Sequence, residues 1–226
     1  MKRYNIFYEV HKGLRNMLYE TAIQIQQTDF INTDETELVL EQIKSLLELF
    51  DKHAHSEDQF VFAAVQAYEP AVVDAFEQEH VKDHALGENL ANMLTALSNA
   101  LSDDEKLRIG RLLYQAFVEF MIFNLQHMAK EEDSINKILW QKYNDEQLKG
   151  ITANIIANIP PVQMAQFTKW MMRGLSNCEI AGWLKEVKNT APDFIFQALM
   201  QTASRELNIH RLQLVQESIT EGAMVA

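Results

Sequence analysis

The chain has 226 residues, of which 47% are hydrophobic and 23% are charged, and its formal net charge is −12. This length fits one large domain or one domain with a substantial extension, and the composition excludes an intrinsically disordered chain. The negative charge, with no cluster of Lys and Arg, argues against nucleic acid and anionic membrane surfaces as partners. Only 7 Gly and 4 Pro are present, which favours helices with short connections over a sheet protein.

Signals for export, membrane insertion and disulfide formation are absent from the sequence. Cys178 is the sole cysteine, so no disulfide can form within the chain. Glu9 and His11 fall where a secretory signal would need an apolar run. No stretch approaches 18 uninterrupted apolar residues, the length expected of a spanning helix. We therefore expect a cytoplasmic protein.

Four long amphipathic helices are predicted in the first two-thirds of the chain, because apolar residues recur there every three or four positions. Asn32 with Glu35 forms a capping pair before the second helix, and Pro70 ends that helix. Ser102 with Glu105 forms a second capping pair, before the fourth helix. The four helices are expected over about 4–30, 33–68, 70–101 and 103–143.

Shorter helices are predicted beyond this point. They are expected over about 145–159, 162–175, 177–188 and 192–210. Trp170, Met171, Met172 and Trp183 are interpreted as the core of this extension; the alternative is an exposed surface that binds a partner. The sequence therefore predicts an all-α protein with two parts: an up-down four-helix bundle at 1–143 and a helical extension at 144–226.

Histidine and glutamate occupy positions in the apolar stripes of all four long helices. Such positions normally hold apolar residues, because burying an imidazole or a carboxylate without a partner costs several kcal/mol. A shared pair of metal ions is the simplest common cause. His55, by contrast, is expected to face solvent, about 200° around the helix from His53. The seven candidate ligands are His11, His53, Glu57, His80, His84, His127 and Glu131.

The spacing of these residues suits metal binding. Residues four apart on a helix differ by about 40° in direction and lie about 6 Å apart along the axis, so a pair can address one site. Three such pairs occur: His53 with Glu57, His80 with His84, and His127 with Glu131. Imidazole and carboxylate ligands suit iron, and also zinc, manganese or cobalt. Two carboxylates with five imidazoles fit two adjacent ions with one open coordination position.

A register comparison tests whether the candidate ligands lie at one level of an up-down bundle. Between the first and second helices, and between the second and third, their separations from the joining turn agree to within two residues. Between the third and fourth helices they differ by seven, since position 82 is 20 residues before Ser102 and position 129 is 27 after it. The comparison supports a common site without establishing it.

The ordered set His…His-x3-Glu…His-x3-His…His-x3-Glu resembles the hemerythrin-like (HHE cation-binding) family, as do HKGLR at 11–15 and HMAKEED at 127–133. The resemblance covers 4–143, and 144–210 resembles an extension found in some bacterial members. It implies an up-down bundle holding a non-haem di-iron centre, which binds O2 or reacts with related small oxidants. By position, the five histidines would be terminal ligands, and Glu57 and Glu131 the bridges.

The last carboxylate departs from one branch of that family. Oxygen-carrying hemerythrins place an Asp five residues after the last His, where this chain has Glu132. Glu131 lies on the buried stripe and is the preferred ligand, with Glu132 as the fallback. Asp58 and Asp83 are interpreted as part of a solvated face. Asn124 either orients a ligand or is a buried polar residue bonded to the backbone.

Three functions are compatible with these features. The first is binding or sensing of O2 or NO at the di-iron centre, with zinc or manganese as substitutes for iron. The second is a di-iron redox enzyme that reduces peroxide or NO, or supplies iron for the repair of damaged iron centres. The third is an iron or redox sensor whose extension contacts a protein partner or a second copy of the chain. The sequence does not separate binding from catalysis, because ligand set and fold would be shared.

Overall fold

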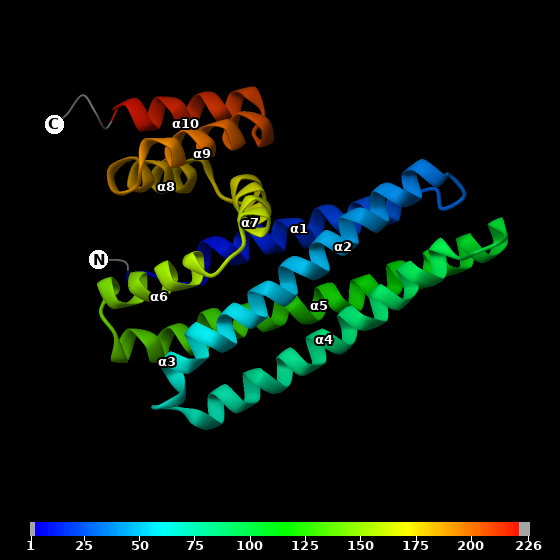
Figure 1. The fold of residues 1–226 in the computed structure, drawn as a ribbon, viewed down its shortest axis with the longest axis horizontal. Helices are drawn as coiled ribbons and strands as arrows, with labels where there is room; N and C mark the ends of the chain where they lie inside the picture. The colour runs from blue at the N-terminus through cyan, green and yellow to red at the C-terminus, as the bar shows by residue number, and fades with distance from the viewer. Residues whose placement is uncertain (1–2, 222–226) are drawn as a thin grey trace. The chain divides into compact units, whose positions relative to one another are not determined.

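A computed structural model describes residues 3–221, and every regular element in that range is a helix. The all-α prediction is therefore confirmed (Figure 1). No helix in the described part of the chain combines the length and apolarity needed to cross a membrane. The elements are α1 (Tyr8–Gln27), α2 (Thr33–Ser56), the π-helix η1 (Glu57–Phe62), α3 (Ala63–Gln66), α4 (Pro70–Ser98), α5 (Asp103–Lys142), α6 (Asp145–Ala157), α7 (Pro161–Gly174), α8 (Asn177–Thr190), α9 (Asp193–Glu206) and α10 (Ile209–Glu221).

Contacts divide the chain into two compact units. The first comprises the residues up to Tyr8 together with Met17–Ile159. The second comprises Glu9–Asn16 together with the residues from Pro160 onward. The contacts thus place α6 with the bundle, whereas the sequence suggested a boundary after residue 143. That the two parts are separate domains stays a prediction.

The first unit is built on long helices that run alongside one another. α2, η1 and α3 follow each other without a break, and α4 and α5 pack against them (Figure 1). Gln42 of α2 donates a hydrogen bond to Thr21 of α1, and Tyr114 of α5 donates one to Gln26 of α1. The apolar core of the first unit includes Phe7, Val61, Phe62, Val65, Val73, Phe76, Ile135, Leu139 and Leu148. Most of these core residues come from helices that also carry candidate ligands.

Side-chain caps fix where the long helices begin. Asn5 Oδ1 accepts hydrogen bonds from the backbone N–H groups of Phe7 and Tyr8, so α1 begins at Tyr8 and not near residue 4. Asn32 Oδ1 caps α2 as predicted, and Ser102 Oγ caps α5 as predicted. These caps satisfy N–H groups that have no partner inside their own helix.

A polar network ties the N-terminal segment to the end of α5 and the start of α6. Arg3 Nε donates to Asp145 Oδ1 at 2.6 Å, and its other nitrogens donate to the carbonyls of Trp140 and Tyr143. Trp140 Nε1 donates to the carbonyl of Tyr4 at 2.6 Å. These bonds explain why α6 belongs with the bundle unit.

The second unit has its own apolar core. Trp170 and Met172 are buried, which supports the interpretation of this region as core. The remaining core residues are Leu175, Ile180, Ala181, Leu184, Leu199, Ala203, Leu207, Val215 and Ile219. One prediction was wrong: the last helix is not continuous to residue 210. It breaks after Glu206, and Asn208 Oδ1 caps α10 by accepting from the N–H of Arg211.

Two glycines allow close approach of backbones inside this second unit. A Cβ on Gly174 would lie 2.4 Å from the carbonyl oxygen of Lys12, and one on Gly13 would lie 2.9 Å from the nitrogen of Met171. Lys12 Nζ also pairs with Glu179 at 2.5 Å. The segment Glu9–Asn16 is therefore packed directly against α7, and the two backbones approach each other closely at these two glycines.

Candidate metal centre

Two histidines and two glutamates converge inside the bundle. One ligand atom from each of Glu57, His80, His127 and Glu131 lies within 4.8 Å of the corresponding atoms of the other three. Glu131 is fully buried, and Glu57 is only 3% exposed. The Nε2 atoms of His80 and His127 face inward, 3.6 Å from Glu57 and 3.4 Å from Glu131, respectively. Four good metal-binding groups thus share one small volume.

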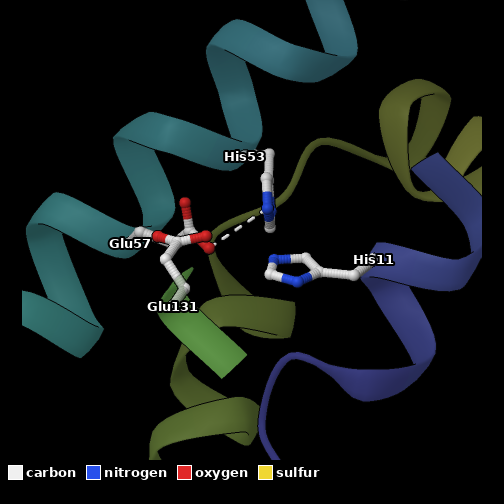
Figure 2. A group of neighbouring side chains, drawn as sticks. All are labelled: His11, His53, Glu57 and Glu131. Atoms are coloured by element: carbon white, nitrogen blue, oxygen red, sulfur yellow. Dashed lines mark ion pairs between the residues drawn. The ribbon is translucent and has the colours of Figure 1, made fainter. Parts of the chain in front are cut away.

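A second group shares the same two carboxylates. His11 and His53 join Glu57 and Glu131, again with ligand atoms within 4.8 Å of one another. Figure 2 shows the two imidazoles and the two carboxylates pointing toward a common point, with an ion pair of 3.1 Å between His53 Nε2 and Glu57 Oε1. Because both glutamates belong to both groups, they lie where bridging ligands would lie.

The helix that carries Glu57 changes its winding at that residue. η1 begins at Glu57 and ends at Phe62, within what the sequence predicted as one regular helix. A π-helix joins residues five apart by hydrogen bonds, and short π segments often occur at functional sites. Glu57 and Phe62, five apart, both contact His80: Glu57 lies 3.6 Å from Nε2, and the Phe62 ring stacks at 5.3 Å. The local winding therefore shapes the surroundings of His80.

Asp58 holds the outer nitrogen of His80. Its Oδ1 lies 2.8 Å from Nδ1 of the imidazole. Asp58 is exposed, as predicted, and belongs to neither group of candidate ligands, but it contacts one of them. Burial by itself would lower the pKa of His80, but hydrogen bonds that the imidazole donates to Asp58 and Glu57, together with the negative charges of these carboxylates, outweigh it and raise that pKa to about 10. The imidazole therefore lies between two carboxylates, one at each nitrogen.

Glu79 holds the outer nitrogen of His127 in the same way. Its Oε2 lies 2.9 Å from Nδ1 of His127, while its Oε1 accepts from Lys130 Nζ at 2.5 Å. Burial would raise the pKa of Glu79, but the hydrogen bonds from Lys130 and His127 lower it below its ordinary value. Burial would lower the pKa of His127, yet hydrogen bonding to Glu131 and the nearby carboxylates raise it. Sequence reasoning missed Glu79, which lies next to His80 in the chain.

A buried polar pair lies one turn from these histidines. Asn124 Nδ2 donates to Asp83 Oδ1 at 2.6 Å and to the carbonyl of Phe120 at 3.1 Å. Asp83 is only 8% exposed, so the prediction that it lies on a solvated face was wrong. Burial raises the pKa of Asp83 more than its partners lower it. The sequence left two roles open for Asn124, and its bond to the backbone agrees with the interpretation as a buried polar residue. Its other partner, Asp83, is not a candidate ligand.

Six of the seven predicted ligands lie in the two groups, whereas His84 belongs to neither group among the residues that the structure describes. The His84 side chain is 67% exposed and lies 4.0 Å from Asp51 and 3.5 Å from Glu88. Glu131 is a member of both groups, and the fallback Glu132 of neither. His55 is exposed, as predicted. That each of these six residues is a metal ligand stays a prediction.

A groove of about 720 Å³ opens between α2 and α4 beside His80. Its apolar wall is formed by side chains such as Leu47, Phe50 and Phe120. Gly87 lies in this wall, where an added Cβ would contact Leu47 at 3.5 Å. The acidic and histidine side chains that line the groove are Glu48, Asp51, His55, Asp58, Glu77, His80, Asp83, His84 and Glu88. Among the residues that the structure describes, no Lys or Arg lines this groove.

The donor set fits a metal centre. Imidazole nitrogens and carboxylate oxygens are ligands for iron, zinc and manganese, and four imidazoles with two shared carboxylates suit two adjacent ions. Burying two carboxylates and several imidazoles in an apolar core is costly unless charge is balanced at the site. Residues 3–139 match the model of the hemerythrin HHE cation-binding domain.

The chain belongs to this family. It is 23% identical to F-box/LRR-repeat protein 5 of Salmo salar over 76% of this chain and 24% of that protein. It is 25% identical to Zinc finger protein BRUTUS of Arabidopsis thaliana over 62% of this chain and 11% of that protein. It is 21% identical to F-box/LRR-repeat protein 5 of Mus musculus over 68% of this chain and 21% of that protein. The chain thus spans a quarter or less of the length of these relatives.

Family membership and the geometry together indicate metal binding inside the bundle. The HHE domain match covers every residue of both groups. It ends at residue 139, before α6, so the helices from α6 onward lie outside the matched region. The resemblance inferred from the histidine and glutamate pattern is therefore confirmed.

Proposed function

We propose that this HHE domain holds two iron ions and binds or senses O2, or NO, at that centre. His11 and His53 would hold one ion, and His80 and His127 the other. Glu57 and Glu131 would bridge them. The observation that carries this proposal is that both carboxylates belong to both four-residue groups, each of which contributes its own two histidines.

Iron is proposed because of the resemblance to the hemerythrin-like family, since the donor types by themselves do not separate iron from zinc or manganese. The donors are imidazoles and carboxylates, with no thiolate, since Cys178 is exposed and belongs to neither group. This donor set leaves zinc and manganese as substitutes. When bound, the two iron ions would supply an open coordination position and the electrons that reversible O2 binding requires.

The residues around His80 would provide the setting for a small ligand. Because His84 points away, the ion held by His80 and His127 would have fewer protein ligands than the sequence suggested. The groove beside His80 connects this side of the bundle with solvent, and Phe50 and Phe120 form part of its apolar wall. An apolar wall favours entry of a neutral diatomic molecule over a hydrated anion.

Regulation through a protein partner is the second candidate function. The relatives named above are much longer proteins, in which the matched segment is only one part. A segment of this kind can serve as a module whose metal state is read by other protein surfaces. This alternative predicts a strong dependence of fold stability on metal, because binding free energy would be coupled to folding.

Metal content and optical spectra of anaerobically purified protein test the proposal. We expect two irons per chain, and new near-ultraviolet and visible bands on exposure to O2 that disappear when O2 is removed. Irreversible oxidation, with product formed over many turnovers under reducing conditions, would favour the redox-enzyme alternative. A content of one zinc ion per chain, or no bound metal after reconstitution with iron, would contradict the di-iron centre.

A further inference from the structure

We propose that Asp58 and Glu79 are positioning residues that fix the ring orientation and tautomer of His80 and His127. This inference rests on the proposed function, because it assigns each imidazole's Nε2 to a metal ion. The carrying observation is geometric: each Nδ1 lies within 3 Å of a carboxylate oxygen, at 2.8 Å for Asp58 and 2.9 Å for Glu79.

An imidazole that donates Nδ1–H to a carboxylate presents Nε2 as the ligand nitrogen. In His80 and His127, Nε2 is the nitrogen that faces the bridging-type carboxylates, at 3.6 Å from Glu57 and 3.4 Å from Glu131. The two Nε2 atoms also lie 3.1 Å apart. Both rings are therefore already turned so that the outer nitrogen meets a carboxylate and the inner one meets the candidate centre.

The π-helix explains how neighbouring residues serve one imidazole. Successive residues of a regular α-helix differ by about 100° in direction, so two adjacent carboxylates rarely reach one ring. Here Glu57 approaches Nε2 and Asp58 approaches Nδ1 of the same His80. Both belong to η1, as does Phe62, whose ring stacks on the imidazole with an interplanar angle of 21°. One turn of π-helix thus contacts His80 on three sides.

Glu79 is itself held in place. Lys130 binds its Oε1, leaving Oε2 directed at His127, so the carboxylate cannot turn away without losing an ion pair. Phe76 and Phe123 flank the His127 ring at centroid distances of 5.7 Å and 6.1 Å. Each ring therefore has a carboxylate at Nδ1 and aromatic contacts. In metal sites such outer partners orient the ligand and raise its basicity.

The test compares Asp58→Ala with Asp51→Ala in the full chain loaded with zinc, which is diamagnetic. Asp51 is a matched control, because it lies on α2, is exposed, and is 4.0 Å from the exposed His84. We expect Asp58→Ala to weaken zinc affinity by about 10- to 100-fold, the range typical for loss of a partner behind a metal ligand, and so to speed zinc release, whereas Asp51→Ala should leave both unchanged. Asp58→Asn, which keeps a neutral acceptor, should fall between them.

Long-range ¹H–¹⁵N NMR spectra of the imidazoles provide a readout that a merely structural role would not move. In the wild type we expect His80 and His127 as Nδ1–H tautomers with slowly exchanging protons. Asp58→Ala should remove that slow exchange at His80 alone. Glu79→Ala should remove it at His127 alone, with Glu77→Ala as its control on the same helix.

The outcomes separate this inference from the proposed function. If the wild type takes up neither zinc nor iron, both are overturned. If it binds metal, but Asp58→Ala and Glu79→Ala match their controls in release rate and imidazole exchange, the centre stands and the positioning role is overturned. Equal helix content of the metal-free variants and wild type, measured by circular dichroism, would confirm that the comparison concerns the site and not the fold.

Discussion

The Nε2 atoms of His80 and His127 lie 3.1 Å apart, although the two residues are 47 positions apart in the chain. That separation suits a shared proton between the two nitrogens in the metal-free protein, with carboxylates around both rings. It is also short enough for both nitrogens to bind one metal ion after small movements. Protons and a metal ion therefore compete for the Nε2 atoms of His80 and His127.

Metal binding should release protons and strengthen as the pH rises. The pKa of His80 in the metal-free fold is raised to about 10, above the value of 6.5 for a free histidine. Its protonated form thus stabilises the metal-free fold. That contribution is fully present below about pH 6.5 and is lost as the pH rises through about 10. Melting of the metal-free protein between pH 6 and 10 should show a falling midpoint, and His80→Gln should flatten the trend.

Removing Glu131 should abolish stable metal binding, while removing Glu132 should not. Glu131 is fully buried and shared by both groups, whereas Glu132 belongs to neither. Glu131→Gln should weaken binding by more than the roughly 100-fold upper range for outer-shell changes. Competition with a chromophoric chelator measures both variants. If Glu132→Gln bound metal more weakly than Glu131→Gln, the ligand would be Glu132 and not Glu131.

Removing His84 should leave metal content unchanged, in contrast to removing His80. The His84 side chain is 67% exposed and contacts Asp51 and Glu88 at the surface, while that of His80 is 9% exposed. Metal content per chain by elemental analysis, after identical reconstitution of His84→Ala and His80→Ala, decides the point. Loss of half the metal in His84→Ala would mean that this side chain rotates inward when metal binds.

Gly174→Ala should destabilise the second unit by about 1–3 kcal/mol, the usual range for an added methyl group that has no space. The new Cβ would lie 2.4 Å from the carbonyl oxygen of Lys12, a backbone atom that cannot move alone. Gly182→Ala is the control, because nothing lies within 4 Å of its added Cβ and alanine favours helix by about 0.5–1 kcal/mol. Urea unfolding should therefore shift in opposite directions for the two variants.

Local sequence signals predicted the bundle well, because helix starts depend on neighbouring residues. The caps at Asn32 and Ser102 are both formed as predicted. The error at the last helix has the same local cause, since Asn208 offers a cap that the continuous apolar pattern concealed. Winding changes such as η1 leave no comparable signal, because the apolar pattern continues through them.

The sequence by itself determined the helical class, the family and the pattern of histidines and glutamates on buried stripes. Only the tertiary structure decided which of them meet: Glu57 and Glu131 are shared by both groups, and His84 is left at the surface. It also decided the roles of Asp58 and Glu79 beside the two imidazoles. Spacing along one helix fixes a direction to within tens of degrees, whereas contact across helices depends on axial register and local winding.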